Sequence, residues 1–129
     1  MPTPSAPPAE AVERFRATLA RLADDFERIG VAVSGGPDSM ALLRLSHAAF
    51  PGQVFAATVD HGLRAEARME ALFVADVCAG LGIPHATLGP APLEPGNVPQ
   101  AARRLRYRLL GQWCAANALP FVAVAHQRD

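Results

Sequence analysis

Residues 34–39 have the types and the spacing expected of a phosphate-binding turn. They read Ser-Gly-Gly-Pro-Asp-Ser and stand between an apolar run and a second apolar segment that begins at residue 40. A strand, a glycine turn and a helix start together direct backbone N–H groups and the positive end of a helix dipole at one point, which suits an anion. Glycine permits positive φ and close backbone approach. The candidate phosphate contacts are therefore Ser34, Gly35, Gly36, Pro37, Asp38 and Ser39.

Asp38 needs a separate explanation, because a carboxylate beside phosphates would repel them. A divalent cation such as Mg²⁺ between the two groups would make the arrangement favourable. Otherwise Asp38 would only stabilise a helix N-terminus, by about 0.3–1 kcal/mol. The turn is not a Walker A loop, which requires GxxxxGK[ST], since the chain contains no lysine. An ordinary strand-to-helix turn is the alternative interpretation of the whole segment.

A second polar segment, residues 60–64, follows another apolar run directly. Asp60 could bind a ribose hydroxyl or support a metal, and His61 and Arg64 could contact phosphates or a polyanionic substrate. Release of Asp, His and Arg together at the end of a buried strand is unusual if the chain only has to turn. A solvated turn that pivots on Gly62 explains the same residues equally well.

Two further groups of polar residues lie in the C-terminal third. Arg103 and Arg106 are three residues apart and would share a helix face, and arginine suits bidentate phosphate contact while Tyr107 could stack on a base. On local grounds a solvated helix face is the better interpretation of this basic segment. His126 is a candidate for phosphate or substrate contact, and Asp129 is a candidate metal ligand or acid.

Composition limits the possible classes of protein. The chain has 129 residues, half of them hydrophobic, with 12 basic residues against 12 acidic ones. That fits one small globular domain and does not by itself indicate a polyanionic partner. Cys78 and Cys114 are isolated, without metal-ligand spacing, and we expect buried free thiols. The sequence shows no signal segment and no run of 18 apolar residues, which predicts a cytoplasmic protein without a membrane partner.

Hydrophobic periodicity indicates the elements that must position these residues. We expect a disordered tail over residues 1–8, helices at 9–26, 38–50, 65–81 and 97–117, and strands at 29–33, 54–59, 83–88 and 119–125. Alternating helices and fully apolar strands predict an α/β fold, a parallel Rossmann-like sheet with helices on both faces. In such sheets ligands bind at the carboxyl ends of the strands, which is where residues 34–39, 60–64 and 126–129 lie.

The periodicity also predicts which side of each helix is apolar. We interpret His47 and His85 as structural, and Asn97 with Gln100 as a helix-capping pair. The apolar positions of the first, third and fourth helices are Val12, Phe15, Leu19, Leu22 and Phe26; Met69, Phe73, Val77 and Leu81; and Val98, Ala102, Leu105, Leu109 and Trp113.

Together these segments resemble the PP-loop ATP pyrophosphatase superfamily, whose phosphate loop reads SGGxDS, and within it the tRNA(Ile)-lysidine synthetase family. Residues 34–39 match at every fixed position, residues 59–64 match VDHGLR, and residues 102–107 match ARxxRY. Residues 125–129 match the start of AHHxDDQxET, except that Gln127 replaces the second His. The resemblance implies an adenine nucleotide alpha hydrolase-like domain over residues 9–129, incomplete at its C-terminal end, in the N-terminal part of a longer protein.

The resemblance also implies a reaction. ATP with Mg²⁺ would adenylate the C2 oxygen of the wobble cytidine of isoleucine tRNA with a CAU anticodon, releasing pyrophosphate. Free L-lysine would then displace AMP to give lysidine. Another PP-loop enzyme, a tRNA thiolation enzyme or an amide-forming synthetase, is an alternative. So is a non-catalytic nucleotide-binding module, and we expect the chain alone to bind nucleotide with little activity.

The resemblance assigns a role to each candidate residue. Catalytic roles fall to Asp38, Arg103, Arg106 and His126, with the last three near the activated base or the leaving phosphates. Mg²⁺ would be held by Asp38 and Asp129. The nucleotide would be bound by residues 34–39 together with Asp60, His61 and Arg64.

Overall fold

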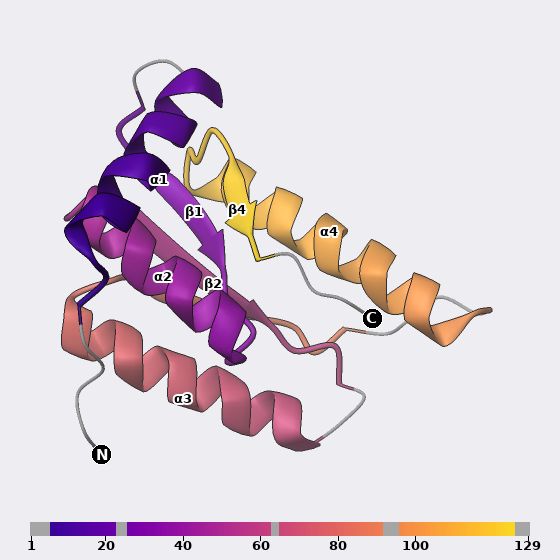
Figure 1. Cartoon of the computed structure of the whole chain (residues 1–129). Coiled ribbons are helices and arrows are strands. Elements are labelled where there is room, and N and C mark those ends of the chain that lie inside the picture. Colours follow the sequence, from indigo (N-terminus) through magenta and orange to yellow (C-terminus); the bar gives the residue numbers. More distant parts are fainter. Residues whose placement is uncertain (1–5, 23–25, 63–64, 92–95, 126–129) are drawn as a thin grey trace.

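A computed structural model describes residues 6–22, 26–62, 65–91 and 96–125 of the chain. Within these ranges, helices and strands alternate after a first helix, in the order that the hydrophobic pattern predicts (Figure 1). The elements are α1 (Ala9–Leu22), β1 (Ile29–Ala32), α2 (Pro37–Ala49), β2 (Val54–Val59), α3 (Ala65–Leu81), β3 (His85–Leu88), α4 (Val98–Ala116) and β4 (Val122–Val124).

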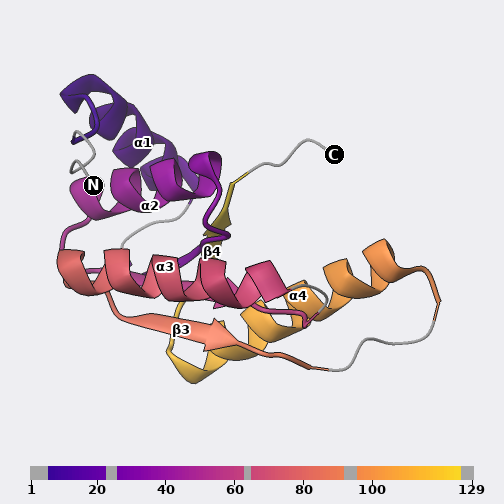
Figure 2. The same cartoon turned by 90° about the horizontal axis from the view of Figure 1, so that it is seen from below.

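The four strands form one parallel sheet in the order β3-β2-β1-β4. The chain moves from β1 to β2 to β3 in one direction and then returns past β1 to place β4 on its other side. Helices α1, α2 and α3 cover one face of the sheet and α4 covers the other (Figures 1 and 2). The predicted α/β fold is therefore confirmed, and the reversal of strand order beside β1 is where such sheets place a ligand site.

Two hydrophobic cores lie on the two faces of the sheet, because successive strand residues point to opposite sides. The core under α1, α2 and α3 is made of large aliphatic side chains such as Ile29, Val31 and Leu43. The core under α4 contributes small residues from the strands, Ala32 and Ala57, against Leu110 and Trp113 of the helix. Gly30 lies below Trp113: a Cβ at this position would come within 3.1 Å of the indole.

Helix α3 has the predicted bounds but not the expected orientation. The face with Met69 and Phe73 is turned outward, and Met69 is 66% exposed. The buried residues are instead Ala67, Ala71, Val74 and Cys78. The small alanine side chains let the helix backbone approach the sheet closely, and the larger residues beside them then lie at the surface.

Helices α1 and α4 show smaller departures of the same kind. In α1, Leu19 is buried, but Leu22 is 77% exposed at the helix end. In α4, Leu105 and Trp113 are buried as expected, whereas Val98 is exposed. Ala101 and Leu110 are buried in place of their neighbours Ala102 and Leu109. The Asn97 cap is confirmed, since its Oδ1 accepts the Gln100 N–H at 3.3 Å.

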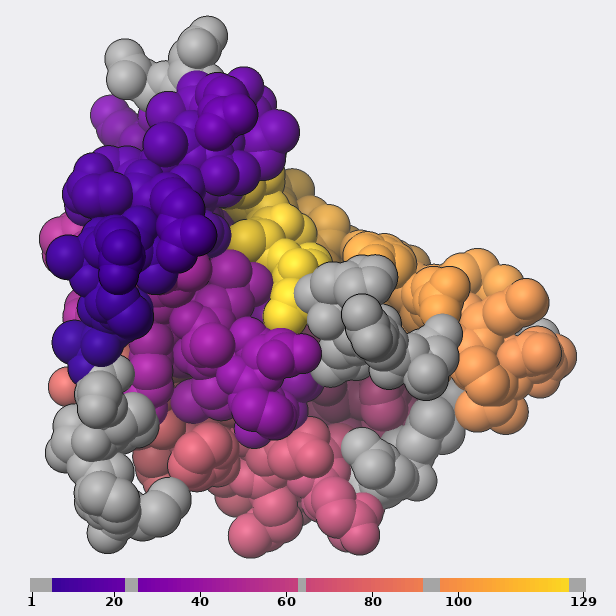
Figure 3. Space-filling view, viewed as in Figure 1, coloured from indigo at the N-terminus to yellow at the C-terminus, as the bar shows by residue number. Residues whose placement is uncertain are grey.

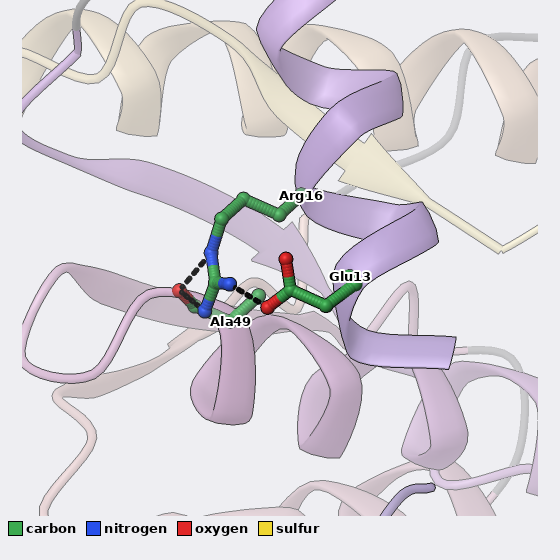
Figure 4. A network of polar contacts seen from close by, with 3 residues as sticks. All are labelled: Glu13, Arg16 and Ala49. Carbon is green, nitrogen blue, oxygen red and sulfur yellow. Dashed lines mark hydrogen bonds and ion pairs between the residues drawn. The ribbon is translucent and has the colours of Figure 1, made fainter. Parts of the chain in front are cut away.

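An arginine of α1 joins this helix to the end of α2. Arg16 donates from Nε and Nη2 to the carbonyl oxygen of Ala49, at 3.3 and 3.1 Å, and its Nη1 pairs with Glu13 (Figure 4). A cation at this position complements the negative end of the α2 dipole. The contact lies at the C-terminal end of α2, opposite the end that begins at the glycine turn.

Three other features bear on the predictions. Cys78 and Cys114 are free thiols; Cys78 is buried and burial raises its pKa to about 11, while Cys114 is only half-buried. Strand β4 forms an edge of the sheet and is visible at the surface beside α1 and α2 (Figure 3). Within the described ranges, no helix combines the length and the apolar character that a membrane span requires.

A candidate nucleotide site at the carboxyl ends of β1 and β2

The turn after β1 is held in shape by its own serine residues. The backbone N–H of Ser34 donates to Ser39 Oγ at 2.8 Å, and the two hydroxyl oxygens lie 3.0 Å apart. The Gly36 N–H in turn donates to Ser34 Oγ at 3.3 Å. Gly35 has φ +88, a conformation that side-chain-bearing residues rarely adopt. The sequence therefore builds a tight loop whose conformation does not depend on its acidic residue.

Helix α2 begins within this turn without a side-chain cap. Gly36 is the N-cap, Pro37 occupies the first helical turn, and the Met40 N–H closes the first intrahelical hydrogen bond to Gly36 O at 3.0 Å. The N–H groups of Asp38 and Ser39 consequently have no partner inside the helix. Together with the helix dipole, free N–H groups of this kind favour an anion; that the loop binds phosphate stays a prediction. The Asp38 side chain is exposed.

A cavity of about 320 Å³ opens beside this turn, at the carboxyl ends of β1 and β2. Its walls come from both faces of the sheet, because consecutive residues of each strand contribute to it. The lining residues are Ala32, Val33, Ser34, Gly36, Ala57, Thr58, Val59, His61, Ala67, Glu70 and Arg106. A cavity of this size with apolar walls and a few polar groups is typical of a small-molecule site.

The turn after β2 uses its aspartate differently. Asp60 is only 7% exposed, and its Oδ1 accepts the Gly62 N–H at 2.9 Å. His61 lines the cavity, and its buried Nδ1 has no hydrogen-bond partner among the described residues. The structure thus gives Asp60 a role in the turn and places His61 at the site. Arg64 lies outside the described residues.

Helix α4, which contains the predicted basic segment, brings one arginine to the cavity. Arg106 is half-buried and lines it, whereas Arg103 is exposed and is not among the lining residues. Tyr107 is exposed as well. Arg106 therefore supplies positive charge to the wall of the cavity, and the predicted pairing of Arg103 with Arg106 at one site remains a prediction.

The fourth polar segment follows β4, which pairs directly with β1. The prediction that residues 126–129 lie near the glycine turn requires β4 to be a neighbour of β1, and this condition is met. His126 and Asp129 themselves lie outside the described residues. Their predicted roles, substrate contact and metal binding, therefore stay predictions.

Sequence reasoning missed one lining residue of the cavity, Glu70, and one hydrogen bond beside it, between Thr58 and His85. Glu70 of α3 lines the cavity, although it belongs to none of the motifs. Thr58, a buried lining residue, shares a 2.9 Å hydrogen bond with His85 Nε2, and burial lowers the pKa of His85, which favours the neutral ring. The period-2 pattern of β2 and β3 could have indicated that Thr58 and His85 share one side of the sheet. Nothing local to Glu70 indicates its position.

The described side chains do not form a metal site on their own. No three His, Cys, Asp or Glu residues within these ranges are grouped closely enough to hold an ion. Mg²⁺, however, is normally held by one or two carboxylates together with substrate phosphates. Asp38 at the helix N-terminus and Glu70 in the cavity wall are compatible with that kind of site.

Comparisons with known proteins identify relatives in sequence. A family model described as a PP-loop domain matches residues 9–129. The chain is 51% identical over 106 residues to a tRNA(Ile)-lysidine synthase of Ruegeria pomeroyi, covering 79% of this chain and 25% of the relative. It is 42% identical over 119 residues to that of Novosphingobium aromaticivorans, covering 92% and 36%. The chain thus spans about a quarter to a third of these curated relatives.

Solved structures share the fold. The U34-tRNA thiolase NcsA from Methanococcus maripaludis, with its [4Fe-4S] cluster, superposes with a TM-score of 0.76 at 19% identity, covering 92% of this chain and 45% of the thiolase. The NH3-dependent NAD synthetase of Campylobacter jejuni gives 0.64 at 19% identity, covering 87% and 54%. At this level of identity the likeness concerns the fold alone.

Proposed function

Because the chain belongs to the PP-loop domain family, we propose that it binds ATP in the cavity beside the glycine turn, as the nucleotide-binding part of an enzyme that modifies isoleucine tRNA. The observation that carries the proposal is the uncapped N-terminus of α2 next to Gly35, opening into a cavity at the strand ends. Similarity to tRNA(Ile)-lysidine synthases over most of the chain supports the choice of substrate.

Each part of the cavity suits one part of ATP. The N–H groups at the start of α2 and the loop of Ser34, Gly35 and Gly36 would bind the phosphates. Arg106 would offset negative charge that develops on them. Asp38 would hold Mg²⁺, with Asp129 as a further predicted ligand; the bound ion would neutralise phosphate charge. The chain needs no lysine side chain for this purpose, since backbone donors and the ion share the charge.

The reaction that we propose for the full-length protein has two displacements. The C2 oxygen of the wobble cytidine, in the CAU anticodon, attacks the α-phosphorus of ATP, and the bond to pyrophosphate breaks. The amine of free L-lysine then attacks C2, and the bond to AMP breaks, leaving lysidine. We place this reaction in the cytoplasm, where tRNA, ATP and lysine meet.

Two alternatives share the fold. For a thiolation or amide-forming enzyme, the structural neighbours are only 19% identical, against 42–51% for the lysidine synthases. Neither Cys78 nor Cys114 is a lining residue of the cavity, so among the described residues no thiol stands ready for sulfur transfer. A non-catalytic nucleotide-binding module is the other alternative, and it applies chiefly to the 129-residue chain by itself.

Mass spectrometry of isoleucine tRNA from cells depleted of the gene that encodes this chain tests the proposal. Loss of lysidine at the wobble position is the expected result, and unchanged lysidine would refute the assignment. Calorimetry with the 129-residue chain should show ATP binding, and assays with ATP, lysine and tRNA should show little product. Robust lysidine synthesis by the chain alone would contradict the expectation that it only binds nucleotide.

A further inference from the structure

Glu70 is the one carboxylate among the described residues that line the cavity. It lies on α3, half-buried, and its stem packs against the glycine turn: a Cβ placed on Gly35 would lie 3.3 Å from Glu70 Cβ and 3.5 Å from its Cγ. No hydrogen bond or ion pair engages its carboxylate within the described part of the chain. The side chain is therefore anchored at its base beside the phosphate loop, while its charged end remains available.

This position sets up an electrostatic conflict unless a cation is present. A carboxylate within a few ångströms of bound phosphates raises their energy, and the effect is larger in a cavity than in open water. Arg106 supplies positive charge in the same cavity but forms no ion pair with Glu70. A divalent cation between carboxylate and phosphate would turn the repulsion into attraction.

The acidic residue of the glycine turn does not remove this conflict. Asp38 is exposed on the first turn of α2 and is not among the residues that line the cavity. The two carboxylates thus come from different helices, one from α2 and one from α3. Mg²⁺ commonly uses one or two carboxylates in addition to phosphate oxygens, so a second carboxylate from α3 stays within the number that such a site requires.

We propose that Glu70 is a carboxylate ligand, from the α3 side, for the divalent cation that accompanies the nucleotide phosphates. The inference rests on the proposed function, because it requires ATP in this cavity. It makes nucleotide binding dependent on the cation: ATP without metal meets the bare carboxylate, whereas the metal complex is bound by it.

The test measures the Kd of a non-hydrolysable ATP analogue for the full-length protein, by calorimetry, in Mg²⁺ and in EDTA. Glu70→Gln should weaken binding in Mg²⁺ by about tenfold or more, the scale on which lost support of a metal site reduces affinity. In EDTA, Glu70→Gln should bind the analogue as tightly as the wild type or more tightly, because the carboxylate that repels the phosphates is gone. Mn²⁺ binding in the presence of the analogue, followed by electron paramagnetic resonance, should weaken in parallel.

The control is Asp76→Asn, the same chemical change on an exposed residue of α3. It should leave both dissociation constants unchanged. If Glu70→Gln does not fold, Glu70→Asp decides the question. The shortened side chain should reduce the increase in nucleotide affinity that Mg²⁺ produces relative to EDTA. An unchanged increase would overturn the proposal.

Three results can be told apart. Equal weakening of Glu70→Gln in Mg²⁺ and in EDTA would mean that Glu70 only supports the loop, and would overturn the proposal. A selective rise in the KM for lysine, with nucleotide and metal affinities unchanged, would overturn it in favour of a site for the lysine ammonium group. Failure of the wild-type protein to bind nucleotide in either condition would instead refute the proposed function itself.

Discussion

The turns after β1 and β2 both follow buried parallel strands and both contain an aspartate, yet the two aspartates differ in their surroundings. Asp38 is exposed, and the turn around it is held by the Ser34 and Ser39 hydroxyls. Asp60 is buried and itself holds its turn through the Gly62 N–H. The comparison shows that Asp60 Oδ1 is engaged by its own turn, whereas the turn around Asp38 is held by other groups and leaves that carboxylate exposed.

The largest effect expected from this comparison is on activity. Asp38→Asn in the full-length protein should reduce ATP-dependent pyrophosphate release by about 100-fold or more, because a lost metal ligand removes several kcal/mol of charge stabilisation. The Tm should stay within about 2 °C of the wild type, as expected for a surface substitution. Turnover and thermal unfolding are measured on the same preparation. Normal turnover in this variant would mean that Asp38 does not hold the ion.

The second effect concerns the contact between the turn after β2 and Gly89, the residue that follows β3. A Cβ on Gly89 would collide with the carbonyl oxygen of Asp60, and Gly89 has φ +96. Gly89→Ala should therefore lower the free energy of unfolding by about 3 kcal/mol, near the upper end for overpacking. Chemical denaturation of the 129-residue chain measures the change.

Gly111→Ala is the matched control for that substitution. Gly111 lies inside α4 and a Cβ there meets nothing within 4 Å. Alanine should raise the free energy of unfolding by about 0.5–1 kcal/mol, the difference in helix propensity. A similar loss of stability in both variants would show that the close contact between Gly89 and Asp60 is not the cause.

The third effect compares the two aspartates directly. Asp60→Ala removes the acceptor of the Gly62 N–H and should lower the free energy of unfolding by about 1–3 kcal/mol. Asp60→Asn keeps an acceptor oxygen in that position and should lower the free energy of unfolding by less than Asp60→Ala does. Asp38→Ala should lower the free energy of unfolding by no more than about 1 kcal/mol, the contribution of an acidic side chain to a helix N-terminus. Equal losses for Asp38→Ala and Asp60→Ala in denaturant titrations would abolish the distinction between the two turns.

The sequence was sufficient for the β1 turn because its constraints are local. Two glycines, two serines and a proline within six residues restrict the backbone so strongly that the motif predicts its own geometry. The strand pattern was sufficient for the sheet, since four apolar runs separated by helices leave few arrangements. For Asp60, by contrast, a turn and a ligand site explained the residues equally well; the structure shows its part in the turn, and its predicted contact with the nucleotide stays a prediction.

Tertiary packing decides what the sequence could not. Periodicity located α3 correctly but did not show that Ala67 and Ala71, rather than Met69 and Phe73, would face the sheet. Hydrophobicity favours the larger side chains, whereas close approach of the helix to the sheet favours the smaller ones. That rotation of α3 is what brings Glu70 to the glycine turn, so the residue could not be assigned to the site before the fold was known.

The smallest effect is a pH dependence of the region beneath the second turn. His85 is hydrogen-bonded to Thr58 of β2, and burial lowers the pKa of the His85 imidazole below the ordinary value of 6.5. As pH falls through about 6.5, the unfolded chain binds a proton that the folded ring does not yet bind, so stability decreases with decreasing pH until the folded ring also protonates. Between pH 7 and pH 5 the Tm of the wild type should therefore fall more than that of His85→Gln, whose amide can still bond Thr58 but does not titrate. If Tm changes with pH equally in the two proteins, His85 does not contribute to the pH dependence, and the turns after β1 and β2 do not differ in this respect.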